Sequence, residues 1–383
     1  MTFIKTNYNR RSFLKASALA SGGMILGFSW LSSCKPKVTD AGVIELPENW
    51  FDINAFLKIG ENGVVTIMSP NPEIGQNVKT SMPMIIAEEL DVDWKKVIVE
   101  QAGFDNSKYT RQLAGGSDSI RTSWNSLRMA GATAKHMLMV AAAQQWNVPV
   151  SELTTQKGVI KHTASGKSIT YGEVASAAAS VEIPEEVALK DPKDFTIIGK
   201  SQKNVDGKKI VMGEPLYGLD IDREGMLIAM IEHPPAFGMK LKSLDASEAK
   251  AMPGIKDVVV VQTEPAEKQW SDTNAFTELV AVVGATTWEV MKAKKALKVE
   301  WEKTGELESS NDHEVGLTDL LANGKAEVAR KDGDPESAFK TAAKVIERTY
   351  SAPFLAHNTM EPMNFFAHVT ADKAVLNRPI QTP

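Results

Sequence analysis

The chain has 383 residues, of which 43% are hydrophobic and 24% charged, and a formal net charge of −5. This length is enough for about two or three domains with real cores, and the apolar content excludes an intrinsically disordered protein. The first 34 residues carry four basic and no acidic side chains, so the remainder holds 39 basic and 48 acidic residues, a net charge of −9. That balance argues against nucleic acid or an anionic membrane surface as the main partner. The single cysteine excludes an internal disulfide, an iron–sulfur cluster and a thiolate zinc site built from this chain.

The N-terminus has the layout of a bacterial export signal. Paired arginines in Arg10-Arg11-Ser12-Phe13-Leu14-Lys15 precede an uncharged, weakly hydrophobic run over residues 16–33, which is too short and too rich in Gly and Ser for a permanent transmembrane helix. The pattern predicts a twin-arginine signal with a lipobox over residues 1–34, lipidated at Cys34, and a tether over residues 35–48. We expect export to the periplasm and a lipid anchor in the membrane. The alternative is a soluble periplasmic protein that is cleaved elsewhere, with Cys34 incidental.

Residues 49–185 are predicted to form one mixed α+β unit. Apolar and polar residues alternate over 50–59 and 64–69 around Gly60-Glu61-Asn62-Gly63, which is typical of a β-hairpin. The other predicted elements are a strand over 96–101, helices over 82–90, 126–146 and 174–181, and a short hairpin around 158–161 and 170–173.

Two polar, glycine-bearing loops precede the first two of these helices. They are Pro72-Glu73-Ile74-Gly75-Gln76 and Leu113-Ala114-Gly115-Gly116-Ser117-Asp118-Ser119. Glycine lets a backbone approach a ligand closely, and a helix N-terminus offers unpaired N–H groups to an anion. Two such termini in one domain would suit a large phosphorylated cofactor. The alternative, which the local chemistry alone favours, is that both loops are ordinary helix N-caps.

A charged, proline-bearing stretch over residues 186–212 is predicted to be a linker. The following unit, residues 213–303, is expected to contain strands over 226–232, 255–262, 279–284 and 297–302, and helices over 246–252 and 287–296. Residues 304–383 begin as a polar, acidic connection and then contain a predicted strand over 345–350. The pattern indicates that this last region is an incomplete domain.

Familiar catalytic motifs are absent: the sequence has no P-loop, no GxSxG elbow, no HExxH and no GxGxxG. His136 lies on an alanine-rich helix and is expected to be packed or at the surface. His233 and His357 fall in irregular segments between strands. His357 and Glu361 could share a metal ion only on a regular helix, which the neighbouring prolines disfavour. We therefore predict structural roles for these residues and assign no metal ligand and no catalytic residue.

Four groups of motifs occur along the chain in a characteristic order. The first group is 72–76 with Thr80 and Ala87-Glu88-Glu89-Leu90, and the second is 115–119 with Trp124, Arg128, 130–132 and 141–143. The third group is 217–220, 233–235, 253–255 and 281–301, and the fourth is 352–362 with 379–383. In this order they resemble the large, molybdopterin-binding subunit of the xanthine dehydrogenase/aldehyde oxidase family, of the isoquinoline 1-oxidoreductase beta-subunit type. The first two groups are similar to its cofactor loops, the third to its α/β hammerhead domain, and the fourth to the start of its main molybdenum-binding region.

The resemblance implies an α+β fold with a permuted molybdopterin-binding segment over 49–185, a hammerhead domain over 213–303 and the start of a molybdenum-binding domain over 304–383. It implies a molybdenum-bearing molybdopterin, as the cytosine dinucleotide, held by Ile74, Gly75, Gln76, Gly115, Gly116, Ser117 and Ser119. Family members hydroxylate an aldehyde or N-heterocycle with water as the oxygen source and pass electrons to a [2Fe–2S] small subunit. A small-molecule substrate, a separate C-terminal half and a cytochrome acceptor are the other partners that it implies.

Two departures from the family pattern bear on activity. Asn77 stands where the family usually has a glycine, and asparagine tolerates the left-handed conformation. The family's GGGFG-type loop and its late glutamate base do not occur in these 383 residues, so we expect this chain alone to be inactive. The resemblance thus predicts the N-terminal half of a molybdenum hydroxylase large subunit. The alternative is an exported lipoprotein that uses the same scaffold as a non-catalytic binding or assembly module.

Overall fold

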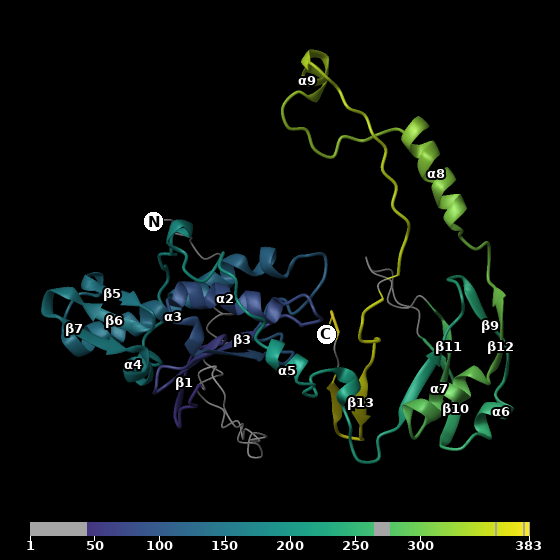
Figure 1. Cartoon of the computed structure of the whole chain (residues 1–383), viewed down its shortest axis with the longest axis horizontal. Helices are drawn as coiled ribbons and strands as arrows, with labels where there is room; N and C mark the ends of the chain where they lie inside the picture. Colours follow the sequence, from purple (N-terminus) through teal and green to yellow (C-terminus); the bar gives the residue numbers. More distant parts are fainter. Residues whose placement is uncertain (1–43, 264–275, 357, 378–379, 383) are drawn as a thin grey trace. The chain divides into compact units, whose positions relative to one another are not determined.

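The computed structural model describes residues 44–263, 276–356, 358–377 and 380–382. The predicted export signal with Cys34, most of the tether, and His357 lie outside these residues. The chain divides into two compact units, Met1–Ile221 with Glu361–Pro383 and Asp222–Met360 (Figure 1). Within the described ranges, no helix combines the length and the apolar character needed to cross a bilayer.

The first unit is built on a four-stranded sheet. Its strands are β1 (Trp50–Asn54), β2 (Leu57–Gly60), β3 (Val65–Ser69) and β4 (Val97–Gln101), in that order across the sheet. The first three pair antiparallel, which confirms the hairpin expected there, whereas β4 pairs parallel to β3. A parallel pair needs a crossover connection, and α2 (Val78–Leu90) supplies it.

A second helix, α3 (Ser119–Trp146), packs closely on α2 (Figure 1). The two backbones nearly touch at Gly131, where a Cβ atom would lie 2.3 Å from the carbonyl oxygen of Ile86. The helices and the sheet enclose one core, whose fully buried members include Ile59, Val65, Ile67, Met82, Ile86, Leu90, Ala134 and Leu138. This core fixes the sheet edge and the two helix N-termini at which the glycine-bearing loops lie.

A small antiparallel sheet extends the first unit. It consists of β5 (Leu153–Gln156), β6 (Val159–His162) and β7 (Lys167–Thr170), and α4 (Tyr171–Ala178) follows it. Thr170 and Glu173 form a capping box, so α4 starts a few residues earlier than expected. The buried Tyr171 hydroxyl donates to the carbonyl of Leu90 at 2.7 Å, which ties this sheet to the end of α2.

Residues 186–198, expected to belong to a linker, instead pack on the helix pair. Val187, Leu189 and Ile197 are each at most 6% exposed. The chain then forms the short helix α5 (Gly207–Val211) and the 3₁₀ turn η5 (Gly218–Asp220), and the hairpin of β13 (Phe366–Val369) and β14 (Ala374–Asn377) belongs to the same unit. The linker prediction failed because Lys190 and the backbone amides of residues 196–198 bind carboxylates buried in the helix pair, which a local pattern cannot reveal.

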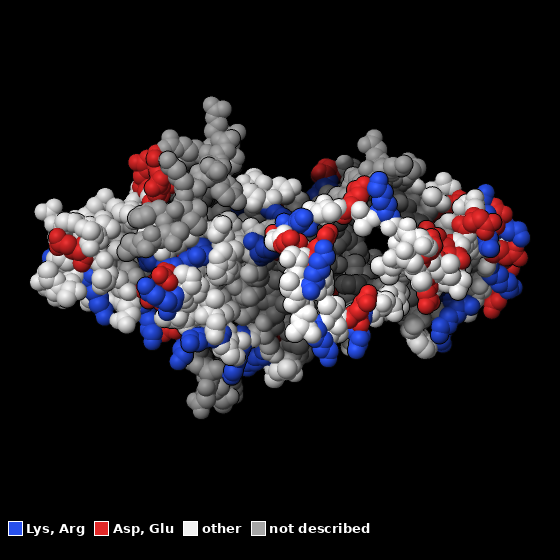
Figure 2. Space-filling model, turned by 90° about the horizontal axis from the view of Figure 1, so that it is seen from above, with Lys and Arg blue, Asp and Glu red and all other residues white. Residues whose placement is uncertain are grey.

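The second unit has a smaller core. Its strands β8 (Ile228–Glu232), β9 (Met239–Asp245), β10 (Ile255–Gln262), β11 (Glu278–Gly284) and β12 (Lys298–Lys303) form a sheet ordered β10-β11-β8 and a β12-β9 ribbon. The helices α6 (Ser247–Lys250) and α7 (Thr287–Lys295) pack against them. Strand β9 was not predicted; its exposed face carries lysines that pair with acidic residues of β12, including Lys240 with Glu302 at 3.0 Å. Acidic and basic side chains are interspersed over the face seen in Figure 2.

The rest of the second unit has no core of its own. It contains α8 (Ser310–Asn323) and α9 (Pro335–Thr341), and every residue from 314 to 356 is exposed. The strand predicted over 345–350 does not form, because this extended segment has no neighbouring strand among the described residues.

Candidate cofactor-binding site

The first loop turns the chain from β3 into α2 through two left-handed residues. Gly75 has φ 101°, and Asn77 has φ 68° and ψ 22°. A Cβ atom at position 75 would meet no atom within 4 Å, so backbone conformation rather than crowding favours glycine there. Asparagine is one of the few other residues that adopt the left-handed region readily. Asn77 can therefore precede the first residue of α2 in this conformation.

The carboxylate of Glu73 accepts hydrogen bonds from backbone amides at the N-terminus of α2. Its Oε1 accepts the N–H groups of Gly75 at 2.7 Å and Asn77 at 3.0 Å, and its Oε2 accepts that of Lys79 at 2.9 Å. A carboxylate at this position is favoured by the helix dipole and satisfies amides that would otherwise lack acceptors. The unpaired amides expected at the first helix N-terminus are thus already bound in this structure.

The side chain of Gln76 also forms hydrogen bonds with the backbone of its own loop. Its Nε2 donates to the carbonyl of Pro72 at 3.0 Å, and its Oε1 accepts the N–H of Ile74 at 2.7 Å. Both Ile74 and Gln76 are exposed, and Ile74 keeps 38% of its surface accessible. The first loop is therefore a self-contained, internally bonded turn that projects Ile74 from the surface.

The second loop has a different character. Gly116 and Ser117 are both left-handed, with φ 61° and 55°, and both are exposed. Asp118 is the N-cap of α3, but its side chain does not cap the helix. In the described part of the chain, no acceptor binds the N–H groups of Gly116, Ser117 or residues 119–121 at the start of α3. Consecutive unpaired amides in such a turn form an anion-binding concavity at the positive end of a long helix.

Two arginines flank this second loop. Asp118 pairs with Arg121 and, at 3.6 Å, with Arg111. The hydrogen bond from Arg121 holds the pKa of Asp118 below its ordinary value, so this carboxylate stays ionised at neutral pH. The loop therefore presents free backbone donors beside two guanidinium groups that share one carboxylate.

A buried polar network connects the bases of the two loops. Asn71, which directly precedes the first loop and is fully buried, donates from Nδ2 to the carbonyl of Leu113 at 2.8 Å and to the hydroxyl of Ser119 at 3.0 Å. The Ser119 hydroxyl is thus engaged inside the protein. Among described residues, the Thr66 Oγ1, Ser69 Oγ and Asn71 Oδ1 atoms are buried without a hydrogen-bond partner. Asn71 directly precedes the first loop, so its unsatisfied oxygen could accept a hydrogen bond from a bound molecule or water.

Residues near the C-terminus also hold the second loop. The N–H of Ala114 donates to the carbonyl of Gln381 at 2.9 Å, and the Gln381 Nε2 donates back to the carbonyl of Ala114 at 2.7 Å. This reciprocal pair joins positions that are 267 residues apart. Sequence reasoning noted both segments but did not bring them together, and it overlooked Asn71 entirely.

Two buried carboxylates on α2 set the geometry behind the loops. Glu88 accepts the N–H groups of Thr196, Ile197 and Ile198 and an Nζ–H of Lys190, all within 2.9 Å. Burial alone would raise the pKa of Glu88, but the Lys190 hydrogen bond and the amides of residues 197 and 198 outweigh it and lower that pKa. The segment 186–198 is thereby fastened to α2 by a charge that no solvent reaches.

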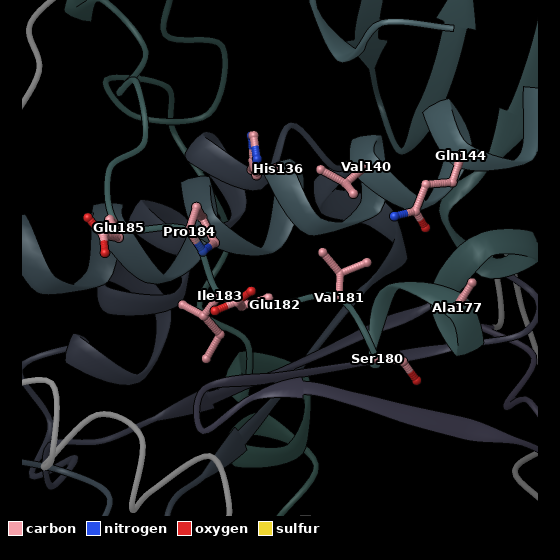
Figure 3. A pocket seen from close by; sticks show the side chains of 10 residues that line it. All are labelled: His136, Val140, Gln144, Ala177, Ser180, Val181, Glu182, Ile183, Pro184 and Glu185. Carbon is pink, nitrogen blue, oxygen red and sulfur yellow. The ribbon is translucent and has the colours of Figure 1, made fainter. Parts of the chain in front are cut away.

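A groove on the surface of the first unit lies elsewhere. It has a volume of about 550 Å³ and runs between α3, α4 and residues 180–185 (Figure 3). His136 lines it from α3, and partial burial lowers the pKa of this histidine. Position 136 follows the start of α3 by 17 residues, or about 26 Å along the helix axis. The groove is therefore separate from the loops, and it brings together no set of catalytic groups.

His233 has structural contacts. The His233 ring stacks on Phe276 with centroids 5.1 Å apart, and its Nδ1 lies 2.8 Å from the carbonyl of Pro234. Glu361 accepts the N–H of Leu219 at 3.1 Å. Across the described ranges, no group of three or more His, Cys, Asp or Glu side chains could hold a metal ion.

Comparison with known proteins identifies relatives over most of the chain. Isoquinoline 1-oxidoreductase subunit beta of Brevundimonas diminuta is 32% identical over 315 residues, which cover 71% of this chain and 38% of the relative. Membrane-bound aldehyde dehydrogenase [pyrroloquinoline-quinone] of Gluconacetobacter polyoxogenes is 27% identical over 95% of this chain and 46% of the relative. A solved CO dehydrogenase from Oligotropha carboxidovorans overlaps 37% of this chain and 18% of its own, with 21% identity and a TM-score of 0.28.

The chain spans less than half the length of these two curated relatives. A sequence profile described as molybdopterin cofactor-binding domain matches residues 13–217. The match includes both glycine-bearing loops, the helix pair behind them and the segment 186–198 that fastens it. This chain belongs to the molybdopterin cofactor-binding domain family, and its relatives include the isoquinoline 1-oxidoreductase beta subunit.

Proposed function

We propose that this chain binds a molybdenum-bearing molybdopterin at its second loop and serves as the cofactor-binding part of a molybdenum hydroxylase. The observation that carries the proposal is the set of free amides at Gly116, Ser117 and residues 119–121 at the start of α3, inside the region that matches the family. A cofactor with phosphate groups and ring N–H donors suits this chemistry. Amides and two arginines would receive phosphate oxygens, and the unsatisfied Asn71 Oδ1 lies beneath the same loop.

The two loops are proposed to contribute to cofactor binding in different ways. Gly115, Gly116 and Ser117 would bind through backbone and hydroxyl donors, whereas Ser119 would hold the loop in shape through Asn71. Gly75, Gln76 and Ile74 would bind only after the loop exchanges some of its internal hydrogen bonds with Glu73 and Pro72. The cytosine dinucleotide form is part of this proposal because a longer phosphorylated cofactor would reach both loops.

When bound, the molybdenum centre would supply two-electron oxidation of an aldehyde or N-heterocycle with water as the oxygen source. The residues of this chain would orient the cofactor and hold its charge, and no side chain here is assigned as the catalytic base. Electrons would leave through a [2Fe–2S] small subunit, because one cysteine cannot ligate a cluster. The names of the relatives, an isoquinoline oxidoreductase and an aldehyde dehydrogenase, support this substrate class.

Location is part of the same proposal. Arg10-Arg11 and Cys34 support export through the twin-arginine pathway, with a lipid anchor at the periplasmic face of the membrane. That pathway carries folded proteins, which agrees with a cofactor inserted before export. The competing function is a non-catalytic exported binding or assembly module. The observation that favours it is that the amides of the first loop and the side chain of Gln76 already have hydrogen-bond partners within the loop.

The test is metal and cofactor analysis of the full chain purified from its native host. Stoichiometric molybdenum with a pterin dinucleotide, plus a co-purifying iron–sulfur polypeptide, is the expected result. Pyrroloquinoline quinone in place of pterin would overturn the cofactor assignment, and the name of one relative makes that measurement necessary. A folded protein with neither cofactor would favour the binding-module alternative.

A further inference from the structure

The loop that follows β4 carries two aromatic rings with opposite surroundings. Tyr109 is 7% exposed and packs edge-on against Phe56 on the sheet, with ring centroids 5.3 Å apart. Phe104, five positions earlier, is 55% exposed. A single exposed apolar side chain is ordinary on a protein surface. What distinguishes Phe104 is how firmly its backbone is held, and by which residue.

The side chain of Gln112 holds the backbone on both sides of Phe104. Its Nε2 donates to the carbonyl of Gly103 at 2.9 Å, and its Oε1 accepts the N–H of Asp105 at 2.6 Å. The same Nε2 donates to the carbonyl of Pro70 at 3.0 Å, just before the first glycine-bearing loop. Gln112 is buried, so water does not compete for these bonds. Phe104 is therefore an exposed ring on a fixed backbone, which lowers the entropy lost when a ligand packs on it.

The residue next to this clamp contacts the second loop. The Arg111 guanidinium lies 3.6 Å from the Asp118 carboxylate and donates to the Thr122 hydroxyl at 3.3 Å, both at the start of α3. Arg111 and Gln112 are consecutive, with Cα atoms about 3.8 Å apart. One dipeptide therefore binds both the loop that carries Phe104 and the turn that carries the free amides. All of these residues belong to the first unit.

A ligand on this surface would meet two kinds of chemistry. The free amides of the second loop, with the guanidinium groups of Arg111 and Arg121 beside them, favour phosphate oxygens. The exposed ring of Phe104 favours the face of a planar heterocycle, because aromatic side chains stack on any base. A heterocycle that is covalently linked to phosphate satisfies both.

We propose that Phe104 is a stacking platform for a planar heterocycle of the phosphorylated cofactor. This inference rests on the proposed function, which supplies a ligand with phosphates and planar rings. Two rings have the required chemistry, the pterin and the nucleobase of a dinucleotide form. The role of Phe104 is to hold one of them in place while the second loop binds the phosphates.

The test measures the binding of three probes to the full chain, produced in a host that makes no molybdopterin. Calorimetry gives the dissociation constants of cytidine diphosphate, dihydroneopterin triphosphate and pyrophosphate. Phe104→Ala should weaken the binding of one heterocyclic probe by about fivefold or more, and leave pyrophosphate within about twofold. Loss of cytidine diphosphate assigns the platform to the nucleobase, and loss of dihydroneopterin triphosphate assigns it to the pterin.

Two further substitutions at the same position separate stacking from simple apolar contact. Phe104→Leu keeps a large apolar side chain without a ring, so it should bind as weakly as Phe104→Ala. Phe104→Tyr keeps the ring and should bind as the natural chain does. The matched control is Trp288→Ala, which removes a 60% exposed ring from the second unit and should change the binding of no probe.

Several outcomes would overturn the platform. They are no binding of either heterocyclic probe, equal binding by the natural chain and Phe104→Ala, full binding by Phe104→Leu, or an equal loss of pyrophosphate. Gly116→Val separates this inference from the proposed function, because it should weaken all three probes. Pyrophosphate that depends on Gly116, with no effect of Phe104, would reject the platform and leave the proposed function standing. Heterocycle binding that depends on Phe104 but not on Gly116 would support stacking and reject the second loop as the phosphate site.

Discussion

The carboxylate of Glu89 on α2 binds the guanidinium of Arg128 on α3 inside the protein, with Arg128 Nε and Glu89 Oε1 2.6 Å apart. Their side chains are 0% and 9% exposed. Arg128 also donates to the carbonyl of Lys190, whose own N–H returns to Glu89 at 2.9 Å. The aromatic rings of Trp124 and Phe195 lie against the same guanidinium, with their centroids 5.6 and 5.3 Å from Arg128 Cζ. Since α2 and α3 each begin at one glycine-bearing loop, this pair fixes how the loops face each other.

Breaking this pair should cost far more than breaking a surface pair. Glu89→Gln leaves the Arg128 charge buried without its counter-ion, so the free energy of unfolding should fall by about 3–5 kcal/mol. The matched control is Glu302→Gln, which breaks an exposed ion pair with Lys240 and should change stability by less than about 1 kcal/mol. Urea unfolding of both variants at neutral pH measures the difference. A similar loss in the free energy of unfolding for the two variants would show that the buried pair does not hold α2 and α3 together.

The stability of the first unit should depend on pH through Glu88. Its pKa is lowered in the folded protein, so the unfolded chain binds the proton more readily. The stability that the charge contributes is therefore complete above the unfolded value of about 4.5, and it is lost as pH falls through the lower folded value. Glu88→Gln should be less stable than the natural protein at pH 7, and the gap should shrink below pH 4.5. Urea unfolding at several pH values checks this; a gap that grows on acidification would contradict it.

Gly116 and Gly166 allow a controlled test of the second loop. Both are left-handed, with φ 61° and 70°, and a Cβ atom added at either position would meet no atom closer than 3.6 Å. Gly116→Val and Gly166→Val should therefore carry a similar strain of about 1–2 kcal/mol. Only the variant at 116 crowds the free amides, so it alone should lose bound molybdenum and pterin. Equal cofactor content per folded protein in the two variants would show that the second loop does not bind the cofactor.

The elements with local patterns were predictable from the sequence. Alternation and helical periodicity placed β3, β4, α2 and α3, because each buries one face against the same core. The left-handed start of α2 was also foreseeable, since Asn77 tolerates that conformation. The resemblance then assigned both loops to the cofactor, and the family match includes them.

What the sequence could not supply were contacts between distant positions. The charged segment 186–198 has the pattern of a linker until Glu88 and Glu89, about 100 positions earlier, are seen to bind its amides. Gln381 and Ala114 are farther apart still. Residues 345–350 show the opposite case, because their pattern predicts a strand but no strand among the described residues pairs with them.

The N-terminus of α2 should become an anion site once Glu73 is removed. Glu73→Ala deprives the amides of Gly75, Asn77 and Lys79 of their acceptor, which should cost about 1–2 kcal/mol, as for other lost N-caps. Inorganic phosphate can then occupy the vacated position and should recover part of the lost thermal stability. Chloride at matched ionic strength should not. The natural protein, whose amides are bound by Glu73, should gain less from phosphate. An equal gain in both proteins would mean that phosphate acts elsewhere, and that Glu73 does not keep anions from the first loop.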